Sequence, residues 1–422
     1  MGSTTENVNN IEKLVIEELG KVKQYNKFKY PLNEKTYNEE EVMAMIKVLL
    51  SDKLTMGSET TAFEKEFAEY VGSKYAVMVN SGSSANLLEI ACITNSMYSK
   101  KLVKGDKIIV PTICWSTSVW PLIQCGLEPV FVDIEAYSLN ADFNEIKKLV
   151  ENDDKIKAVL AVHILGNTTN MDALTALCAK HKLQLIEDTC EALGSTYNGK
   201  YLGTFGECGS YSFYFSHHLT TIEGGMVVCN SKEVYELLKC LRAHGWTRHL
   251  IDENRRWYED KYPEIDPKFL FINVGYNFRP METQAAMGRI QLKKLAGRNA
   301  NRRKNFAAVN KLVLASKTDK LKSVVATDNC DPAWFGLPFI LNEKVDKKKY
   351  LSAVESKGFD TRPVVTGNFT RQPAFKLLGY DVNADDFPNA NIVHDRGFFI
   401  GLPSRKMTDE EIQETADALI SS

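Results

Sequence analysis

Short apolar runs alternate with longer amphipathic stretches from about residue 38 to about residue 230. The short runs predict strands, because each is rich in aliphatic residues and ends in polar or glycine-containing sequence. The predicted strands are Tyr75–Val79, Lys107–Val110, Pro129–Asp133, Ala158–His163, Leu183–Asp188, Ser210–Phe215 and Met226–Cys229. Some of these runs have no polar face, as in AVLAVHIL from Ala158 onward, which is typical of strands buried on both sides.

The amphipathic stretches between these runs predict helices. Clear examples are Ala85–Tyr98, Asp142–Glu151 and Met171–His181. Strands that alternate with helices form a mainly parallel sheet covered by helices, so the pattern predicts an α/β fold. Further along the chain, Met281–Leu314 predicts a long connecting helix. A strand at Trp334–Leu341 and a helix at Lys347–Ser356 then follow.

The length of the chain predicts more than one domain, because 422 residues exceed what one compact core usually holds. We expect an N-terminal extension and linker over residues 1–35, with a helix at Ile11–Tyr25. A large domain is expected over residues 36–300, and a smaller α+β domain over residues 301–422.

Composition and charge narrow the function. The formal net charge is −2 and no long basic block is present, which argues against a nucleic-acid or membrane-surface role. No apolar run is long enough for a membrane span or a signal peptide. The nine cysteines are dispersed and show no CxC or CxxC spacing. This pattern predicts reduced thiols in a cytoplasmic enzyme, with neither a zinc nor an iron–sulfur site.

Three clusters carry candidate chemistry. The first is the small-residue segment from Asn80 to Asn86, between a predicted strand and a predicted helix. Backbone amides of Gly82, Ser83 and Ser84 at a helix N-terminus suit a phosphate. The alternative interpretation, a serine-rich helix cap, is at least as common when the segment is taken alone.

The second cluster ends the buried run Leu185–Glu191. Asp188 lies where a parallel strand emerges, at the edge of the sheet where α/β proteins bind ligands. A carboxylate there can keep a pyridine nitrogen protonated, or it can simply cap the next helix.

The third cluster runs from Ser212 to Gly225 and contains the adjacent residues His217 and His218, followed by Glu223-Gly224-Gly225. Two adjacent histidines are usually surface residues or bonded to backbone, and no metal-ligand spacing surrounds them. Alone they would be weak evidence.

In this order the clusters resemble the DegT/DnrJ/EryC1/StrS sugar aminotransferases, which are pyridoxal-phosphate (PLP) enzymes of fold type I. The resemblance runs from about Leu54 to the C-terminus. The family motif S-F-x-x-x-K-x-x-x-x-x-E-G-G places its Schiff-base lysine at His217 of this chain, and no lysine lies between Lys200 and Lys232. The resemblance therefore implies an aspartate-aminotransferase-like fold, with a mainly parallel mixed sheet in the large domain and a smaller C-terminal α+β domain.

Segments shared with a histidine-containing subgroup of the family support a departure from aminotransferase chemistry. They are Ser216-His-His, Leu241–Arg248, Val274–Pro280 and Arg362–Phe369. A second histidine-containing branch uses an iron–sulfur cluster on cysteines that include CxC, a set that this chain lacks.

The resemblance assigns roles to individual residues. Residues implied to hold the cofactor are Gly82, Ser83 and Ser212 at its phosphate, Trp115 stacked on its ring, Asp188 at its nitrogen, Glu191 nearby, and Asn277 from a neighbouring subunit. Residues implied to bind the sugar are Ser216, His244, Arg248 and, from the neighbour, Phe269. Candidates for a diphosphate are Arg242, Arg279 and Arg362, because a guanidinium suits phosphate geometry. The active site would then require a homodimer.

The substitution of histidine for lysine implies a dehydratase. Imidazole cannot form the stable imine that lysine forms, but it can move protons near neutral pH. We expect L-glutamate to convert PLP to pyridoxamine phosphate (PMP), and His217 to act as the base when the C3 hydroxyl of a nucleotide-linked 4-keto-6-deoxy sugar is expelled. GDP is the expected nucleotide, and ammonia is released. A CDP- or dTDP-linked substrate, a sugar aminotransferase and a non-catalytic binding protein remain as alternatives.

Overall fold

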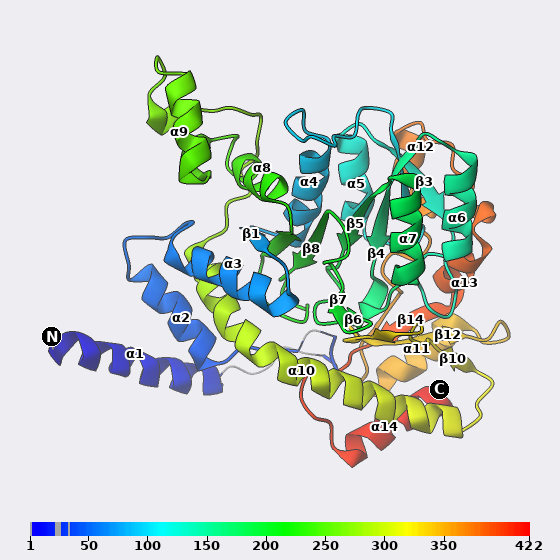
Figure 1. Ribbon diagram of the computed structural model, residues 1–422. Coiled ribbons are helices and arrows are strands. Elements are labelled where there is room, and N and C mark those ends of the chain that lie inside the picture. Colours follow the sequence, from blue (N-terminus) through cyan, green and yellow to red (C-terminus); the bar gives the residue numbers. More distant parts are fainter. Residues whose placement is uncertain (1, 22–26, 33) are drawn as a thin grey trace.

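The computed structural model describes residues 2–21, 27–32 and 34–422 (Figure 1). Its large sheet has seven strands in the order β1-β9-β8-β5-β4-β2-β3. The strands are β1 (Tyr75–Val79), β2 (Lys107–Pro111), β3 (Glu128–Val132), β4 (Ile156–Val162), β5 (Gln184–Asp188), β8 (Cys208–Ser212) and β9 (Gly225–Cys229). All pairs from β8 to β3 are parallel, whereas β9 is antiparallel to β8 and β1. The expected mainly parallel mixed sheet is confirmed.

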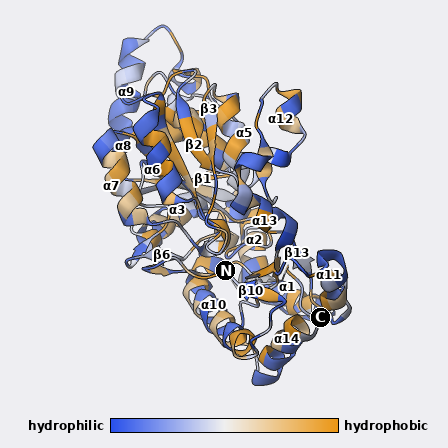
Figure 2. Cartoon of the chain, turned by 90° about the vertical axis from the view of Figure 1, so that its right-hand side faces the viewer, coloured by the Kyte–Doolittle hydropathy of each residue, from blue (hydrophilic) through white to orange (hydrophobic). Residues whose placement is uncertain are grey.

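Helices cover both faces of this sheet (Figure 1). One face carries α4 (Gly82–Ile93), α5 (Ser116–Gln124) and α8 (Lys232–Arg242), and the other carries α3 (Ser58–Val71), α6 (Phe143–Asn152) and α7 (Met171–His181). Alternate residues of β4 pack into different cores: Leu160 faces the side of α4, whereas Val159 and Ala161 face the side of α7. Burial on both faces explains why most residues of β2 and β4 are apolar, and Figure 2 shows β2 in the hydrophobic colour.

A long helix, α10 (Glu282–Ala315), connects the large sheet to a second, antiparallel sheet in the order β10-β12-β14-β13. The strands of this sheet are β10 (Leu321–Ser323), β12 (Leu337–Leu341), β13 (Thr361–Arg362) and β14 (Gly397–Ile400). The helices after α10 are α11 (Lys347–Ser356), α12 (Ala374–Leu377), α13 (Pro388–Arg396) and α14 (Asp409–Ser421). The predicted domain boundary at residue 300 lies inside α10, and we retain that division as a proposal.

Two features of the fold were not anticipated. A three-stranded sheet joins β6 (Thr196–Tyr197) and β7 (Lys200–Tyr201) to β11 (Cys330–Asp331) from the C-terminal part. The helix α9 (Asp252–Lys261) projects from the large sheet, is mostly hydrophilic and contains no buried residue (Figures 1 and 2).

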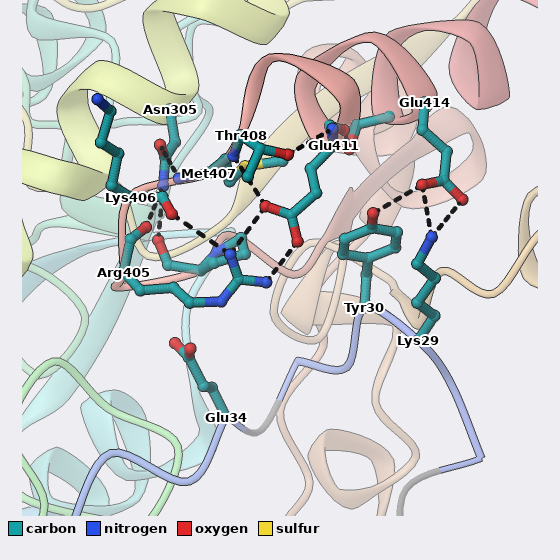
Figure 3. Close-up of polar contacts among 12 residues, drawn as sticks. Lys29, Tyr30, Glu34, Asn305, Arg405, Lys406, Met407, Thr408, Glu411 and Glu414 are labelled. Atoms are coloured by element: carbon teal, nitrogen blue, oxygen red, sulfur yellow. Dashed lines mark hydrogen bonds and ion pairs between the residues drawn. The ribbon is translucent and has the colours of Figure 1, made fainter.

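The N-terminal extension is tied to the C-terminal part of the chain. It begins with α1 (Gly2–Lys21), which overlaps the predicted helix Ile11–Tyr25, of which residues 22–25 lie outside the described residues. After the N-terminal strap (residues 27–32 and 34–37) comes α2 (Glu39–Leu49). On the strap, the Tyr30 hydroxyl donates to Glu414 Oε2 at 2.8 Å, and Lys29 Nζ forms an ion pair with the same carboxylate (Figure 3).

Three predicted elements had boundaries that were wrong by several residues. The helix expected at Ala85–Tyr98 starts at Gly82 and ends at Ile93. The strand expected at Ser210–Phe215 ends at Ser212, because Tyr214 N–H donates to Ser212 Oγ and starts a turn. The strand expected at Trp334–Leu341 starts at Leu337. Among the described residues, no helix combines the length and apolar character needed to cross a membrane.

Candidate active site

A cavity of about 560 Å³ lies at the carboxyl ends of the parallel strands, between the large sheet, the strap and the small sheet. Nine of the residues singled out in the sequence line it: Gly82, Ser83, Trp115, Asp188, Glu191, Ser212, Ser216, His217 and Arg362. They come from segments far apart in the chain, so the parallel topology brings them together.

One end of the cavity is a cradle for an anion. Gly82 and Ser83 line it with the first backbone amides of α4, which have no acceptor within a helix. A Cβ on Gly82 would lie 2.5 Å from Cβ of Ser212, so glycine is required for α4 to approach β8 this closely. Gly225 packs against the same turn, since a Cβ there would lie 2.4 Å from the Ser81 carbonyl oxygen.

The expected role of Ser84 in this cradle was wrong. Its backbone amide donates to the Oγ of Ser81, the N-cap of α4, at 3.1 Å. The amide is therefore used by the helix cap, and Ser84 does not line the cavity.

Asp188 occupies the floor of the cavity at the end of β5 and is 4% exposed. Its Oδ2 accepts from Asn86 Nδ2 and from Ser118 Oγ, both at 2.7 Å, and its Oδ1 accepts from Cys190 N–H at 3.1 Å. Asn86 and Ser118 are on α4 and α5, so three neighbouring elements fix this carboxylate. Such support is what a buried charge requires.

His217 faces the cavity from the turn after β8. Its Nδ1 lies 2.7 Å from the carbonyl oxygen of Cys190. A carbonyl only accepts, so Nδ1 carries the proton and Nε2 has a free lone pair. Burial lowers the pKa of His217 to about 4, against the opposing effect of this hydrogen bond. The imidazole is therefore neutral at pH 7 and able to accept a proton at Nε2.

Glu191 lines the same cavity as His217 and is half-buried. Burial raises its pKa to about 7, although its Oε2 accepts from the backbone amide of Leu165 at 3.1 Å. The site thus holds a neutral imidazole and a carboxyl group that titrates near neutral pH.

The other candidates lie outside the cavity of their own chain. Asn277 and Phe269 are exposed, as residues that act in a neighbouring subunit would have to be. His244 is exposed, and the Arg248 guanidinium stacks 5.1 Å from the ring centroid of Trp246. Arg279 Nε donates to Asn277 Oδ1 at 2.9 Å.

The diphosphate role considered for Arg242 was wrong. The residue is 2% exposed, and its Nη1 contacts Glu64 Oε1 at 2.5 Å and the Met78 carbonyl oxygen at 2.6 Å. A buried, paired guanidinium is a structural tie.

Sequence reasoning assigned no role to two groups of cavity residues. The first supports the polar floor: Asn86, Thr117 and Ser118. The second forms an apolar wall opposite: Leu32, Phe335, Pro363, Val365 and Phe399. A buried asparagine in the first turns of an otherwise apolar helix was a usable signal for Asn86. Pro363 and Val365 lie in Arg362–Phe369, one of the segments shared with the histidine-containing subgroup, whereas Leu32, Phe335 and Phe399 carried no signal, since such residues look like ordinary core residues.

Comparisons with known proteins agree with this architecture. The sequence model of the DegT/DnrJ/EryC1/StrS aminotransferase family matches residues 35–420. The GDP-4-keto-6-deoxy-D-mannose 3-dehydratase of Escherichia coli O55:H7 is 40% identical over 386 residues, covering 90% of this chain and 97% of the relative. The enzyme of the same name from Yersinia pseudotuberculosis is 38% identical over 377 residues, covering 88% and 93%.

A solved structure extends the likeness to three dimensions. The crystal structure of GDP-4-keto-6-deoxymannose-3-dehydratase with a trapped PLP-glutamate geminal diamine is 39% identical and has a TM-score of 0.85. The match covers 92% of this chain and 100% of that one. The expected fold and family are both confirmed: the chain belongs to the DegT/DnrJ/EryC1/StrS aminotransferase family.

Proposed function

We propose that this protein is a PLP/PMP-dependent 3-dehydratase that acts on GDP-4-keto-6-deoxy-D-mannose. The observation that carries the proposal is His217, which takes the position of the family's lysine and faces the cavity beside Asp188. Among the described residues that line the cavity, none is a lysine. The names of the relatives support both the reaction and the GDP-linked sugar.

The residues present fit a pyridoxal cofactor held without a covalent bond. The α4 amides, with Ser212, suit its phosphate, and the close approach of Gly82 to Ser212 leaves the cradle open where a larger residue would fill it. Asp188 suits a protonated pyridine nitrogen, and Trp115, which is 56% exposed at the cavity, offers a face for stacking. When bound, the cofactor in its amino form supplies an amino group for the sugar ketone and an electron sink.

His217 is the proton acceptor in this proposal. The Cys190 carbonyl fixes Nδ1–H, and Nε2 takes the proton whose removal drives the C3 hydroxyl out of the sugar. Asp188 keeps its negative charge close to the site of electron acceptance and so favours that step. Ser216, next to His217, and Arg362 line the same cavity and are proposed to contact the substrate.

The atom balance requires L-glutamate. Glutamate contributes its amino group and two reducing equivalents and leaves as 2-oxoglutarate. The sugar loses the C3 oxygen as water, and the amino group is lost as ammonia after hydrolysis. The products are a 4-keto-3,6-dideoxy sugar, 2-oxoglutarate and ammonia in equal amounts.

We also propose a homodimer in which Asn277 and Phe269 reach the partner's cavity. Other large apolar side chains in this part of the chain would be left in water by a monomer: Phe271, Val274 and Met281, with Val274 89% exposed. An exposed apolar surface of this kind is typical of an interface. Sedimentation should detect a dimer. The Asn277→Ala variant should bind the cofactor more weakly but should remain a dimer. For its location we propose the cytoplasm, in keeping with its dispersed, unpaired cysteines.

A product assay tests the reaction. The protein is incubated with PLP, L-glutamate and GDP-4-keto-6-deoxymannose, and the nucleotide sugar is analysed by mass spectrometry. The proposal predicts a product that is lighter by one oxygen atom and is formed only when glutamate is present. An amino sugar would instead identify an aminotransferase. Turnover of only the CDP- or dTDP-linked sugar would overturn the GDP assignment.

A further inference from the structure

The two adjacent histidines have different surroundings, and the proposed reaction uses only one of them. His217 lines the cavity, whereas His218 is 2% exposed and points away from it into the protein. The Nε2 of His218 contacts the carbonyl oxygen of Ala333, a residue from the C-terminal part of the chain. Because a carbonyl only accepts, Nε2 carries the proton and donates it.

This hydrogen bond comes at a cost to stability. The Nδ1 of His218 is buried and has no hydrogen-bond partner among the described residues. An unpaired buried acceptor is unfavourable, and an apolar side chain of similar size would avoid it. A histidine at this position is therefore useful for its Nε2–H donor.

The segment that His218 holds is fixed residue by residue. Ala333 N–H donates to Ser195 Oγ at 2.8 Å, and Phe335 N–H donates to the Leu165 carbonyl at 3.0 Å. Arg302 on α10, itself buried, donates from Nη1 to the Phe335 carbonyl at 3.0 Å and to the Trp334 carbonyl at 3.3 Å. Each residue from 333 to 335 is thus anchored through its backbone, and His218 and Ser195 supply the two anchors at Ala333.

This segment places the ring of Phe335 against both histidines. The ring centroid lies 5.1 Å from that of His217 and 5.6 Å from that of His218, in edge-to-face arrangements. Phe335 also lines the cavity. One aromatic side chain therefore covers the imidazole of His217 and keeps water from one side of it.

The charged and titratable groups around His217 come from three elements. They are Asp188, Cys190 and Glu191 at the end of β5 and just after it, Tyr214 and His218 on the turn after β8, and Arg302 on α10. Burial is the largest cause of the low pKa of His217, and Arg302 lowers it further, whereas Asp188 raises it. Admitting water beside Phe335 would weaken the largest of these effects.

We infer that His218 is a positioning residue, which helps to anchor the 333–335 segment so that Phe335 covers one side of the His217 imidazole and shields that side from water. The importance of this role for catalysis rests on the proposed function. The geometry does not depend on the proposed function, since all the contacts that it involves lie within this chain.

The test measures the titration of His217 without requiring turnover. Diethylpyrocarbonate reacts with neutral imidazole, so the pH dependence of His217 modification, followed by peptide mass spectrometry, reports its pKa. Three variants are compared with the wild type. His218→Gln retains an N–H donor, His218→Phe removes it, and Phe335→Leu removes the aromatic cover directly.

We expect the midpoint of modification to lie below pH 5 in the wild type and in His218→Gln. In His218→Phe and Phe335→Leu it should rise by at least one pH unit, and the acid limb of the kcat–pH profile should move to higher pH by the same amount, with little change in KM. An unchanged midpoint in folded Phe335→Leu overturns the inference even if His218→Phe does not fold. An unchanged midpoint in folded His218→Phe also overturns it. If the midpoint shifts in the variants but the wild type itself yields no deoxy sugar, the positioning role is supported and the proposed function is rejected.

Discussion

The floor of the cavity and the wall opposite it are held in place by different interactions. The floor, from the large domain, is polar, and Asp188 is fixed there by side chains of α4 and α5. The opposite wall, from the strap and the small domain, is apolar except for Arg362, and the backbone of its Phe335 is held by hydrogen bonds to distant parts of the chain. The floor carries charge and the opposite wall excludes water. Removal of the charged group in the floor should therefore have the largest effect on the reaction, and substitutions in the wall should shift its pH dependence or the stability.

The largest effect is expected at the centre of the floor. Asp188→Ala removes the buried carboxylate that would pair with the pyridine nitrogen. Loss of one partner of a buried ion pair costs about 3–5 kcal/mol, or roughly 10²- to 5 × 10³-fold in affinity or rate. Cofactor binding followed by absorbance and kcat/KM should both fall. Ser118→Ala, which removes only one supporting hydrogen bond, is the matched control and should retain most activity.

A smaller effect is expected at the cradle. In Gly82→Ala the new methyl group would lie only 2.5 Å from Cβ of Ser212, so α4 must move away from β8. We expect cofactor affinity, measured by fluorescence titration, to fall about 10- to 100-fold, because charge-assisted hydrogen bonds of roughly 1.5–3 kcal/mol are lost. Gly105→Ala is the control for a glycine-to-alanine change away from the cavity. A Cβ there would meet no atom within 4 Å, and its φ of +89° adds strain only locally. Equal binding by the Gly82 and Gly105 variants would contradict the cradle.

The floor was more predictable from sequence than the wall opposite it. Asp188, Ser212 and Gly82 stand at strand ends and helix starts, where short motifs carry a chemical reason for the residue type. Phe335 and Leu32 belong to no motif, and only the packing of the small domain and strap brings them to the cavity. Strands were placed well because burial on both faces makes them continuously apolar. The small β6-β7-β11 sheet was missed because its two-residue strands leave no pattern.

The pH dependence of stability should reveal the half-buried carboxyl group beside the wall. Because burial raises the pKa of Glu191 to about 7, the folded protein retains a proton that the unfolded chain releases near pH 4.5. Raising the pH from 5 to 8 should therefore destabilise the wild type relative to Glu191→Gln. We expect a difference of about 1–3 kcal/mol, reduced from the full shift by solvent in the cavity. Chemical denaturation at both pH values measures it, and parallel pH profiles for the two proteins would refute the assignment.

The smallest effect is expected in the strap. Tyr30→Phe removes the hydroxyl that donates to Glu414 at 2.8 Å (Figure 3). The stacking of this ring on Phe359, at 4.5 Å between centroids, is retained. We expect a loss of about 0.5–1.5 kcal/mol in the free energy of unfolding and unchanged kcat. A large loss of activity would show that the strap contributes more to the site than Leu32.

The central claim is that His217 is the base for removal of the C3 hydroxyl, and a stoichiometric comparison of wild type with His217→Asn tests it most directly. Both proteins are loaded with PMP, mixed with GDP-4-keto-6-deoxymannose, and assayed for the deoxy sugar and ammonia. The account predicts equal amounts of both products from the wild type, and a rate at least 10²-fold lower in the variant, as expected for loss of a general base. Dehydration by His217→Asn at the wild-type rate would contradict it.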